Sequence, residues 1–247
     1  MRVCGLDIET TGLEHSKDHV TELGWVIKDI GDPKPLVMKS RFCELPDGVV
    51  LTDEIRNLTK ITPEHCAHGA PFFTNMSQLC ADLERFKVDY IVAHNGENFD
   101  KPFLQARAQM LPGATPALFT ELFDRPWLDT KEDCVYPPDC FYSNLMYVAA
   151  YFGFLNPFPH AALFDAMTTL KVLEQFDVAQ VVERARHPWV VVKALTSYEE
   201  RHLAKARRYF WETLGTKTYP KQWIKKVKEC DLEKEIAEAP FKVVKIA

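Results

Sequence analysis

The chain has 247 residues, a hydrophobic content of 47% and a formal net charge of −5. These values predict a soluble globular chain that is long enough for one substantial core and a small appendage. No basic stretch precedes an apolar signal segment, and the longest apolar run, residues 145–155, is too short to span a bilayer. We therefore expect no membrane partner.

Seven cysteines occur without any C-x-x-C pair, and their odd number leaves one unpaired in any disulfide scheme. Reduced thiols are typical of a cytoplasmic protein, and this location is our prediction. A structural zinc site is the alternative.

Apolar runs alternate with helical stripes along the first 183 residues, which predicts an α/β domain over residues 1–183. A Thr62-Pro63-Glu64 start is typical of a helix, because Thr caps it and Pro suits its first position. In chain order, strands are expected over residues 2–9, 21–29, 36–44 and 89–93, and helices over 53–58, from 62, through 76–86, from 100 and over 145–152.

The first candidate site lies in the opening apolar run, residues 3–9. Strand side chains alternate between faces, so Asp7 and Glu9 point to the same side. Neighbouring carboxylates repel each other and lose their water when buried, unless hard cations neutralise them. Mg²⁺ or Mn²⁺ is the natural candidate, since these ions prefer carboxylate oxygens. The alternative is an edge strand whose acids are solvated.

Asp100 follows a second apolar run, residues 89–93, and a turn-like His94-Asn95-Gly96. It opens a helical pattern and therefore lies near a strand-to-helix junction. The helix dipole also favours an acid in a first turn, so a capping role is the alternative to metal binding.

Asp165 begins a third periodic stretch, and His160 lies five residues earlier in a Pro-rich loop. The loop is expected to leave His160 free to move. Neutral imidazole accepts protons near pH 7, which suits a general base. The alternative for a lone loop histidine is a solvated surface position.

The composition changes after about residue 183. Residues 184–247 contain 15 Lys and Arg against 8 Asp and Glu, a balance of +7, whereas the first 183 residues contain 15 against 27, or −12. The tail predicts a small α+β domain, with strands over residues 189–193, 222–227 and 241–246 and helices over 198–211 and 231–239.

Lys205, Arg207 and Arg208 lie directly before three consecutive aromatic residues in this tail. Positive charge beside aromatic faces can neutralise phosphates and stack bases, which predicts a nucleic-acid patch. The alternative is that the aromatics form the small domain's core, and we favour this interpretation for Trp211 and Trp223.

Together the three motifs resemble those of the DEDDh 3′-5′ exonuclease superfamily, whose name stands for four acids and a histidine. The matching residues are Asp7 and Glu9, then Asp100, then His160 with Asp165, in this order. The second motif is one residue longer than in several bacterial members and is more similar to the three-prime repair type. The resemblance covers about residues 1–178. It implies a ribonuclease-H-like fold, a three-layer mixed sheet with helices on both faces.

The resemblance also implies a role for each motif residue. Asp7 would bridge two Mg²⁺ or Mn²⁺ ions, Glu9 and Asp165 would hold the ion beside the nucleophile, and Asp100 would act on the other side. Two ions about 4 Å apart stabilise the attacking and leaving oxygens of a phosphodiester. His160 would be the general base.

Four further residues are implied substrate contacts. Thr11 and Gly12 would offer backbone groups to the terminal 3′ nucleotide, Leu13 would press against the last bases, and Asn95 is an additional candidate. We therefore predict a 3′-5′ exonuclease that releases nucleoside 5′-monophosphates from single-stranded or frayed DNA. RNA is the alternative substrate, because discrimination depends on the 2′-hydroxyl. A nucleic-acid-binding subunit associated with a polymerase or repair partner is the alternative from another class.

Overall fold

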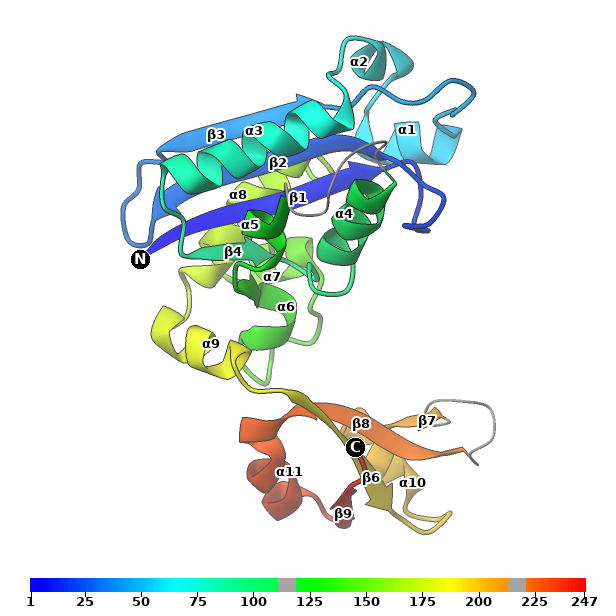
Figure 1. Cartoon of the computed structure of the whole chain (residues 1–247). Helices are drawn as coiled ribbons and strands as arrows, with labels where there is room; N and C mark the ends of the chain where they lie inside the picture. The colour runs from blue at the N-terminus through cyan, green and yellow to red at the C-terminus, as the bar shows by residue number, and fades with distance from the viewer. Residues whose placement is uncertain (111–118, 213–220) are drawn as a thin grey trace. The chain divides into compact units, whose positions relative to one another are not determined.

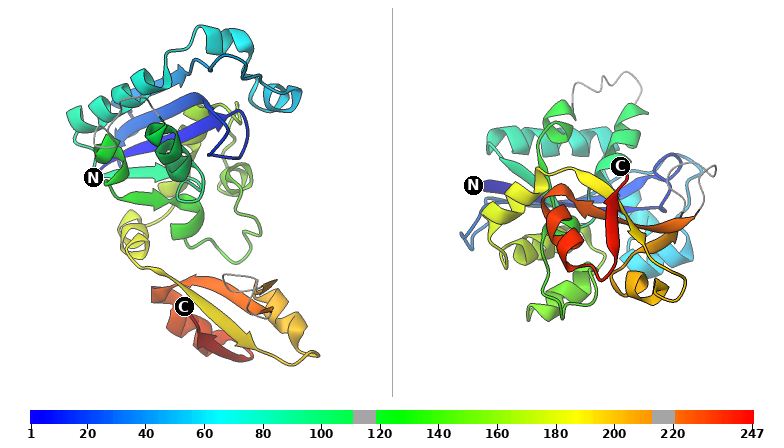
Figure 2. Two further views of the ribbon diagram at one scale, coloured as in Figure 1. Left: turned by 45° about the vertical axis from the view of Figure 1, so that its right-hand side comes forward. Right: turned by 90° about the horizontal axis from the view of Figure 1, so that it is seen from below.

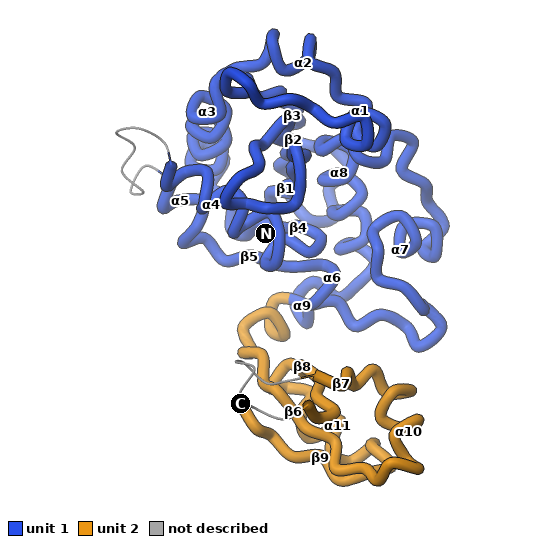
Figure 3. Tube along the Cα trace, turned by 90° about the vertical axis from the view of Figure 1, so that its right-hand side faces the viewer, with its two compact units in different colours: residues 1–181 blue, residues 182–247 orange. Residues whose placement is uncertain are grey.

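The structure, a computed structural model, describes residues 1–110, 119–212 and 221–247. It divides into two compact units, residues 1–181 and 182–247, and each is described by itself (Figure 3). Composition had placed the boundary two residues later. Within the described ranges, no helix is long and apolar enough to cross a membrane.

Unit 1 is built on a five-stranded mixed sheet of β1 (Arg2–Thr10), β2 (Val20–Asp29), β3 (Val37–Phe42), β4 (Tyr90–Ala93) and β5 (Trp127–Asp129). The strand order is β3-β2-β1-β4-β5. β1 pairs antiparallel with β2 and parallel with β4, so it occupies the centre of the sheet. The mixed sheet and its helices confirm the expected α/β class (Figure 1).

The helices that accompany this sheet lie between and after its strands in the sequence (Figures 1 and 2). They are α1 (Asp53–Thr59), α2 (Pro63–Ala67), α3 (Phe72–Arg85), α4 (Asp100–Gln109), α5 (Thr120–Phe123), α6 (Thr130–Asp133), α7 (Leu145–Tyr151), α8 (Ala162–Leu173) and α9 (Val178–Ala185). As the sequence predicts, the Thr62 side chain caps α2 and Pro63 takes its first position.

One face of the sheet forms the main core with α3. Leu6 of β1 and Trp25 of β2 are fully buried in one cluster with Met76 and Leu79 of α3. These four positions follow the strand and helix periodicities of the sequence. Fully burying each such side chain contributes about 1.5–3 kcal/mol to the free energy of unfolding.

α8 packs on the other face of β1 and β2, and it contacts the sheet at two glycines. A Cβ on Gly24 would lie 2.2 Å from the carbonyl carbon of Ala162, and one on Gly5 would lie 2.8 Å from the carbonyl oxygen of Ala166. Only glycine therefore allows the α8 backbone to lie this close to the sheet. Gly5 shares its face of β1 with the two acids of that strand, so α8 covers the acidic face.

Unit 2 is a four-stranded antiparallel sheet of β6 (Trp189–Leu195), β7 (Phe210–Glu212), β8 (Gln222–Lys228) and β9 (Lys242–Lys245), in the order β7-β8-β6-β9. Its helices are α10 (Arg201–Ala206) and α11 (Leu232–Glu238), with a short 3-10 helix, η2 (Glu229–Asp231). The core of the unit lies on one face of the sheet, where Val190, Val192, Ala204 and Tyr209 are buried together.

The single helix expected over residues 198–211 is wrong. α10 ends at Ala206, Arg208 has a left-handed φ of 62°, and the chain then forms β7. Trp211 and Trp223 face each other across β7 and β8 with ring centroids 5.4 Å apart. Trp223 packs against the core as expected, but Trp211 is 51% exposed because it lies on an edge strand, so its predicted core position is wrong.

Candidate active site

Asp7 and Glu9 lie on the face of β1 that α8 covers. Glu9 is 9% exposed and faces Glu22 of β2. Burial and, after it, the charge of Asp165 raise the pKa of Glu9 to about 8. Desolvation raises the pKa of Asp7 well above its ordinary value, and the charge of Asp100 adds to this shift. Because β1 is the central strand, the alternative of solvated edge-strand acids is wrong.

Asp100 is the first residue of α4 and is 2% exposed. Its Oδ1 accepts the backbone N–H of Ile8 at 3.1 Å, between the two acids of β1. Burial raises its pKa to about 7, and the charges of Asp129 and Asp165 act in the same direction. Asp100 therefore contacts the strand that carries the other acids, which a plain helix cap would not do.

Asp165 lies in the first turn of α8 and holds the loop before it. Its Oδ2 accepts the backbone N–H of His160 at 3.1 Å, and its Oδ1 accepts the side-chain amide of Asn156. Burial raises the pKa of Asp165 to about 6, although these hydrogen bonds oppose the shift. His160 has a left-handed φ of 61° and is tied to α8. Asp165 therefore holds the His160 backbone, and movement of its side chain stays a prediction.

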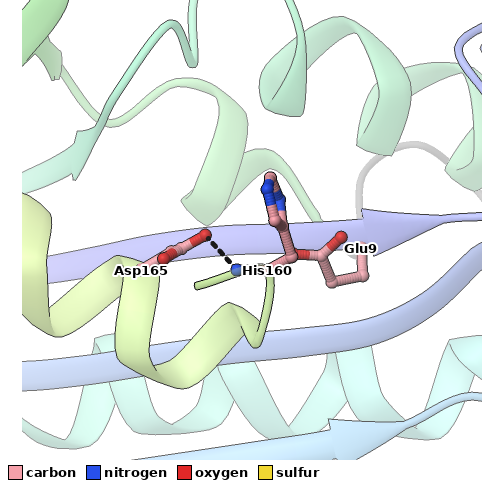
Figure 4. A group of neighbouring side chains, drawn as sticks. All are labelled: Glu9, His160 and Asp165. Carbon is pink, nitrogen blue, oxygen red and sulfur yellow. Dashed lines mark hydrogen bonds between the residues drawn. The ribbon is translucent and has the colours of Figure 1, made fainter. Parts of the chain in front are cut away.

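Glu9, His160 and Asp165 form a group that could hold a metal ion. One ligand atom from each lies within 4.8 Å of the others (Figure 4). They come from β1, from the loop before α8 and from α8. Asp7 and Asp100 lie outside this group of three, but their carboxylates interact electrostatically with the same acids. A site dominated by buried carboxylate oxygens fits a hard cation such as Mg²⁺ or Mn²⁺.

We expect the metal-free protein to lose stability as pH rises from 5 to 8. Glu9, Asp100 and Asp165 have pKa values of about 8, 7 and 6 in the folded protein, against ordinary values of 4.5, 3.8 and 3.8. In this pH range the folded state keeps protons that the unfolded chain has released, so the free energy of unfolding falls as these groups ionise.

Thermal unfolding at pH 5 and pH 8, in EDTA and in Mg²⁺, tests this expectation. The melting temperature in EDTA should be lower at pH 8, and Mg²⁺ should restore it at pH 8 more than at pH 5. Glu9→Gln should show a shallower pH dependence. A melting temperature in EDTA that rises from pH 5 to pH 8 would contradict the assignment of these acids to one repelling cluster.

Glu22 is a fifth acid at the site and is itself buried, and the motif pattern did not include it. It is 4% exposed and lies opposite Glu9. Its carboxylate accepts the backbone N–H of Ala162 at 3.1 Å and the hydroxyl of Ser40 at 2.6 Å. Glu22 therefore fastens the first residue of α8 to β2. An acid within an otherwise apolar strand was the available signal in the sequence.

Asp129 holds the turn of the second motif, as Glu22 holds the start of α8. It is 1% exposed, and it accepts the backbone N–H groups of Asn95 at 2.8 Å, Glu97 at 3.2 Å and Lys131 at 3.0 Å. The Lys131 ammonium also donates to Asn95 Oδ1 at 2.9 Å. These bonds hold the turn before Asp100, where Asn95 has a left-handed φ of 71°.

The other implied substrate contacts lie in the loop after β1. The Thr11 hydroxyl donates to Asp18 at 3.1 Å, and a Cβ on Gly12 would lie 2.5 Å from an Asp18 oxygen. The loop is therefore folded around Asp18. Leu13 is 82% exposed at its tip. Contact of Thr11, Gly12, Leu13 or Asn95 with substrate stays a prediction.

The predicted basic patch lies at the end of α10 and just after it. The Arg207 guanidinium donates to both carboxylate oxygens of Glu235, at 3.1 and 3.0 Å. Tyr209 also donates to Glu235, at 3.1 Å, so Arg207 helps to fix α11 inside unit 2. Lys205 is exposed. A nucleic-acid role for Lys205, Arg207 and Arg208 stays a prediction, with Arg207 already engaged in an ion pair.

Comparison with known proteins places this geometry in a family. The RNase T exonuclease model matches residues 4–173, and no curated protein sequence matches the chain. The nuclease domain of 3′hExo, a DEDDh family member solved with rAMP, is 15% identical with a TM-score of 0.58, over 70% of this chain and 90% of that one. E. coli exonuclease I, solved with a dA16 oligonucleotide, is 13% identical with a TM-score of 0.60.

The match to E. coli exonuclease I covers 92% of this chain but 63% of that one, so this chain spans less than two thirds of that enzyme. Both structural likenesses support the ribonuclease-H-like fold. The family match spans most of unit 1 and includes all five motif residues. The chain therefore belongs to the RNase T exonuclease family.

Proposed function

We propose that the chain is a metal-dependent exonuclease that removes nucleoside 5′-monophosphates from the 3′ ends of single-stranded or frayed DNA. The observation that carries this proposal is the grouping of Glu9, His160 and Asp165, within 4.8 Å of one another, beside the half-buried Asp7 and the buried Asp100. Burial and, after it, mutual repulsion raise the pKa values of Asp7 and Glu9, and a bound cation would offset both effects.

Asp7, Glu9, Asp100 and Asp165 would hold two Mg²⁺ or Mn²⁺ ions. When bound, such ions stabilise the attacking and leaving oxygens of an in-line displacement at phosphorus. His160 is the proposed general base, and an imidazole nitrogen would take the proton of the attacking water. Its backbone is fixed by Asp165 while its side chain remains half-exposed, which suits a group that exchanges protons with solvent.

The proposal names DNA, and not RNA, as the substrate. E. coli exonuclease I, whose match extends over 92% of this chain, was solved with a DNA oligonucleotide, which supports single-stranded DNA. The 3′hExo nuclease domain was solved with rAMP, and a related 3′-exonuclease structure is described as recognising a histone mRNA stem-loop. RNA therefore stays the alternative substrate.

Timed digestion of end-labelled single-stranded DNA, duplex DNA and RNA of the same sequence tests the substrate. With Mg²⁺ we expect single-stranded DNA to shorten from its 3′ end and to release mononucleotides, and blunt duplex DNA to be digested more slowly. EDTA should stop the reaction. Activity that persists in EDTA would contradict the metal-dependent mechanism, and faster digestion of RNA would assign the enzyme to RNA.

We expect Glu22→Ala to lower kcat by about 10- to 100-fold, the usual cost of losing a residue that orients metal ligands. The reason is the lost acceptor for the Ala162 N–H, which lets the first turn of α8 and its Asp165 shift. Glu22→Gln keeps an oxygen acceptor and should recover much of the rate. Ser40→Ala, which removes only the hydroxyl bound to Glu22, is the matched control.

Steady-state kinetics and Mg²⁺ titration of the three variants check this expectation. In Glu22→Ala the loss should appear in kcat and in the Mg²⁺ requirement, while the oligonucleotide KM changes little. Wild-type kcat in a folded Glu22→Ala protein would show that β2 does not position α8 for catalysis.

A further inference from the structure

One face of the unit 2 sheet carries no helix among the described residues of that unit. Val190, Val192 and Ala194 of β6 point to the helical side and form its core. Strand alternation then places Trp189 and Lys193 on the opposite side. We call this side the open face; the strand register puts on it Trp189, Lys193, Phe210, Ile224, Lys226 and Lys242.

The open face concentrates the positive charge of the unit. Of the eight acids in residues 184–247, Glu212 alone occupies an open-face strand position, against Lys193, Lys226 and Lys242; Lys228, which the register also places there, is buried beside Trp189. The helical side carries acids that neutralise its cations, as in the ion pairs of Glu235 with Arg207 at 3.0 Å and with Lys225 at 2.8 Å. The net positive charge of residues 184–247 is therefore carried by the open face of the sheet and not by the helical side.

Aromatic and aliphatic side chains lie between these lysines. Phe210 is 61% exposed and Trp189 is 41% exposed. Phe210, Ile224 and Lys193 form one row across three strands, because Phe210 pairs with Ile224 and Ile224 pairs with Lys193. A row of this kind presents a flat apolar surface flanked by ammonium groups.

We propose that the open face is a docking surface for single-stranded nucleic acid. Bases stack on exposed aromatic rings with little sequence preference, and lysines follow the phosphates. Phe210 and Trp189 would take bases, and Lys193 and Lys226 would take phosphates. This proposal rests on the proposed function, since the strand held there is the one whose 3′ end unit 1 cleaves. It differs from the predicted patch of Lys205, Arg207 and Arg208 in lying on the sheet and not on α10.

Binding of a fluorescent single-stranded oligonucleotide to the full chain, in EDTA so that nothing is cleaved, tests the proposal over a series of salt concentrations. Lys226→Glu on the open face is compared with Lys234→Glu, which makes the same charge change on the exposed surface of α11. Phe210→Ala is compared with Ile236→Ala, which removes an exposed apolar side chain from the same helix.

We expect Lys226→Glu to weaken binding about fivefold at 0.1 M salt and to make the salt slope shallower by about 0.7, the value for one phosphate contact on a single strand. Phe210→Ala should weaken binding by at least about fivefold, the lower end of the effect of losing one stacked base. The two α11 variants should change affinity by less than about twofold. Lys226→Gln removes the positive charge without adding a negative one. It replaces Lys226→Glu in the comparison if the glutamate variant misfolds.

Three outcomes would overturn the proposal. Equal losses in Lys226→Glu and Lys234→Glu would show a nonspecific effect of net charge. Unchanged affinity in both Lys226→Glu and Phe210→Ala would show that the face serves protein packing. A further variant, Lys205→Glu, tests the predicted patch. A loss of affinity confined to this variant would assign binding to α10. Hydrolysis of a labelled dinucleotide with Mg²⁺, which needs only the acidic site, should stay unchanged in all variants. If the wild-type chain hydrolyses no dinucleotide, the proposed function fails independently of any strand binding.

Discussion

We expect Asp7→Ala to abolish turnover and to leave the protein folded. Asp7 is half-buried at the centre of the acid cluster, and its pKa is raised by desolvation and then by the charges of Asp100, Asp165, Glu9 and Glu22. Removing it takes away the carboxylate proposed to contact both metal ions, so the rate should fall by at least about 10³-fold, as for other groups that stabilise transition-state charge.

The same change should stabilise the metal-free protein at pH 8, because one of several repelling charges is lost. This opposite effect on rate and on stability is what separates a metal ligand from a structural acid. Single-turnover kinetics and melting temperature in EDTA are the measurements, and Asp47→Ala, at an exposed acid far along the chain, is the control. A near-normal rate in Asp7→Ala would contradict the metal-dependent mechanism.

His160→Ala is expected to lower kcat by about 10²- to 10⁴-fold, the usual contribution of a general base. Oligonucleotide binding should persist, because the loop backbone is still held by Asp165. The acidic limb of the pH–rate profile, which reports the protonation of the base, should disappear. His202→Ala, at an exposed histidine of unit 2, is the control and should leave the profile unchanged.

Mg²⁺ titration decides between two roles for this histidine. His160 lies in the group of possible metal ligands, within 4.8 Å of Glu9 and Asp165. A general base leaves the Mg²⁺ requirement of the variant near that of the wild type. A large rise in the Mg²⁺ requirement with a retained acidic limb would make His160 a ligand and would remove it from the proposed proton transfer.

The catalytic motifs could be predicted from sequence because each lies at the end of an element with strong periodicity. The β1 acids follow a continuous apolar run, and the helices that begin near Asp100 and Asp165 have buried stripes. The expected starts of β1, β2 and α4 differ from the structure by no more than one residue. Hydrophobic patterning determines these elements locally, so the order of the motifs was enough to identify the family.

The supporting acids could not be predicted in the same way, because their partners are distant in sequence. Glu22 bonds to a backbone amide 140 residues away, and Asp129 bonds to one 34 residues away. β5, which carries Asp129, has only three residues and too little pattern to detect. The error over residues 198–211 has a local cause, since a single left-handed residue, Arg208, ends a helical pattern that the composition would continue.

Two glycines, Gly5 and Gly24, allow α8 to lie close to the sheet, on the face opposite the main core. Main chain meets main chain at Gly24, and Gly5 contacts both the α8 backbone and the Leu170 side chain, so the height of Asp165 above the β1 acids is set largely by backbone contact. The main core of this unit lies on the opposite face, around Trp25 and Leu79. Substitutions in that core can therefore accumulate and change stability while the spacing of the catalytic groups stays fixed, which leaves the sequence of unit 1 wide freedom to diverge around an unchanged reaction centre.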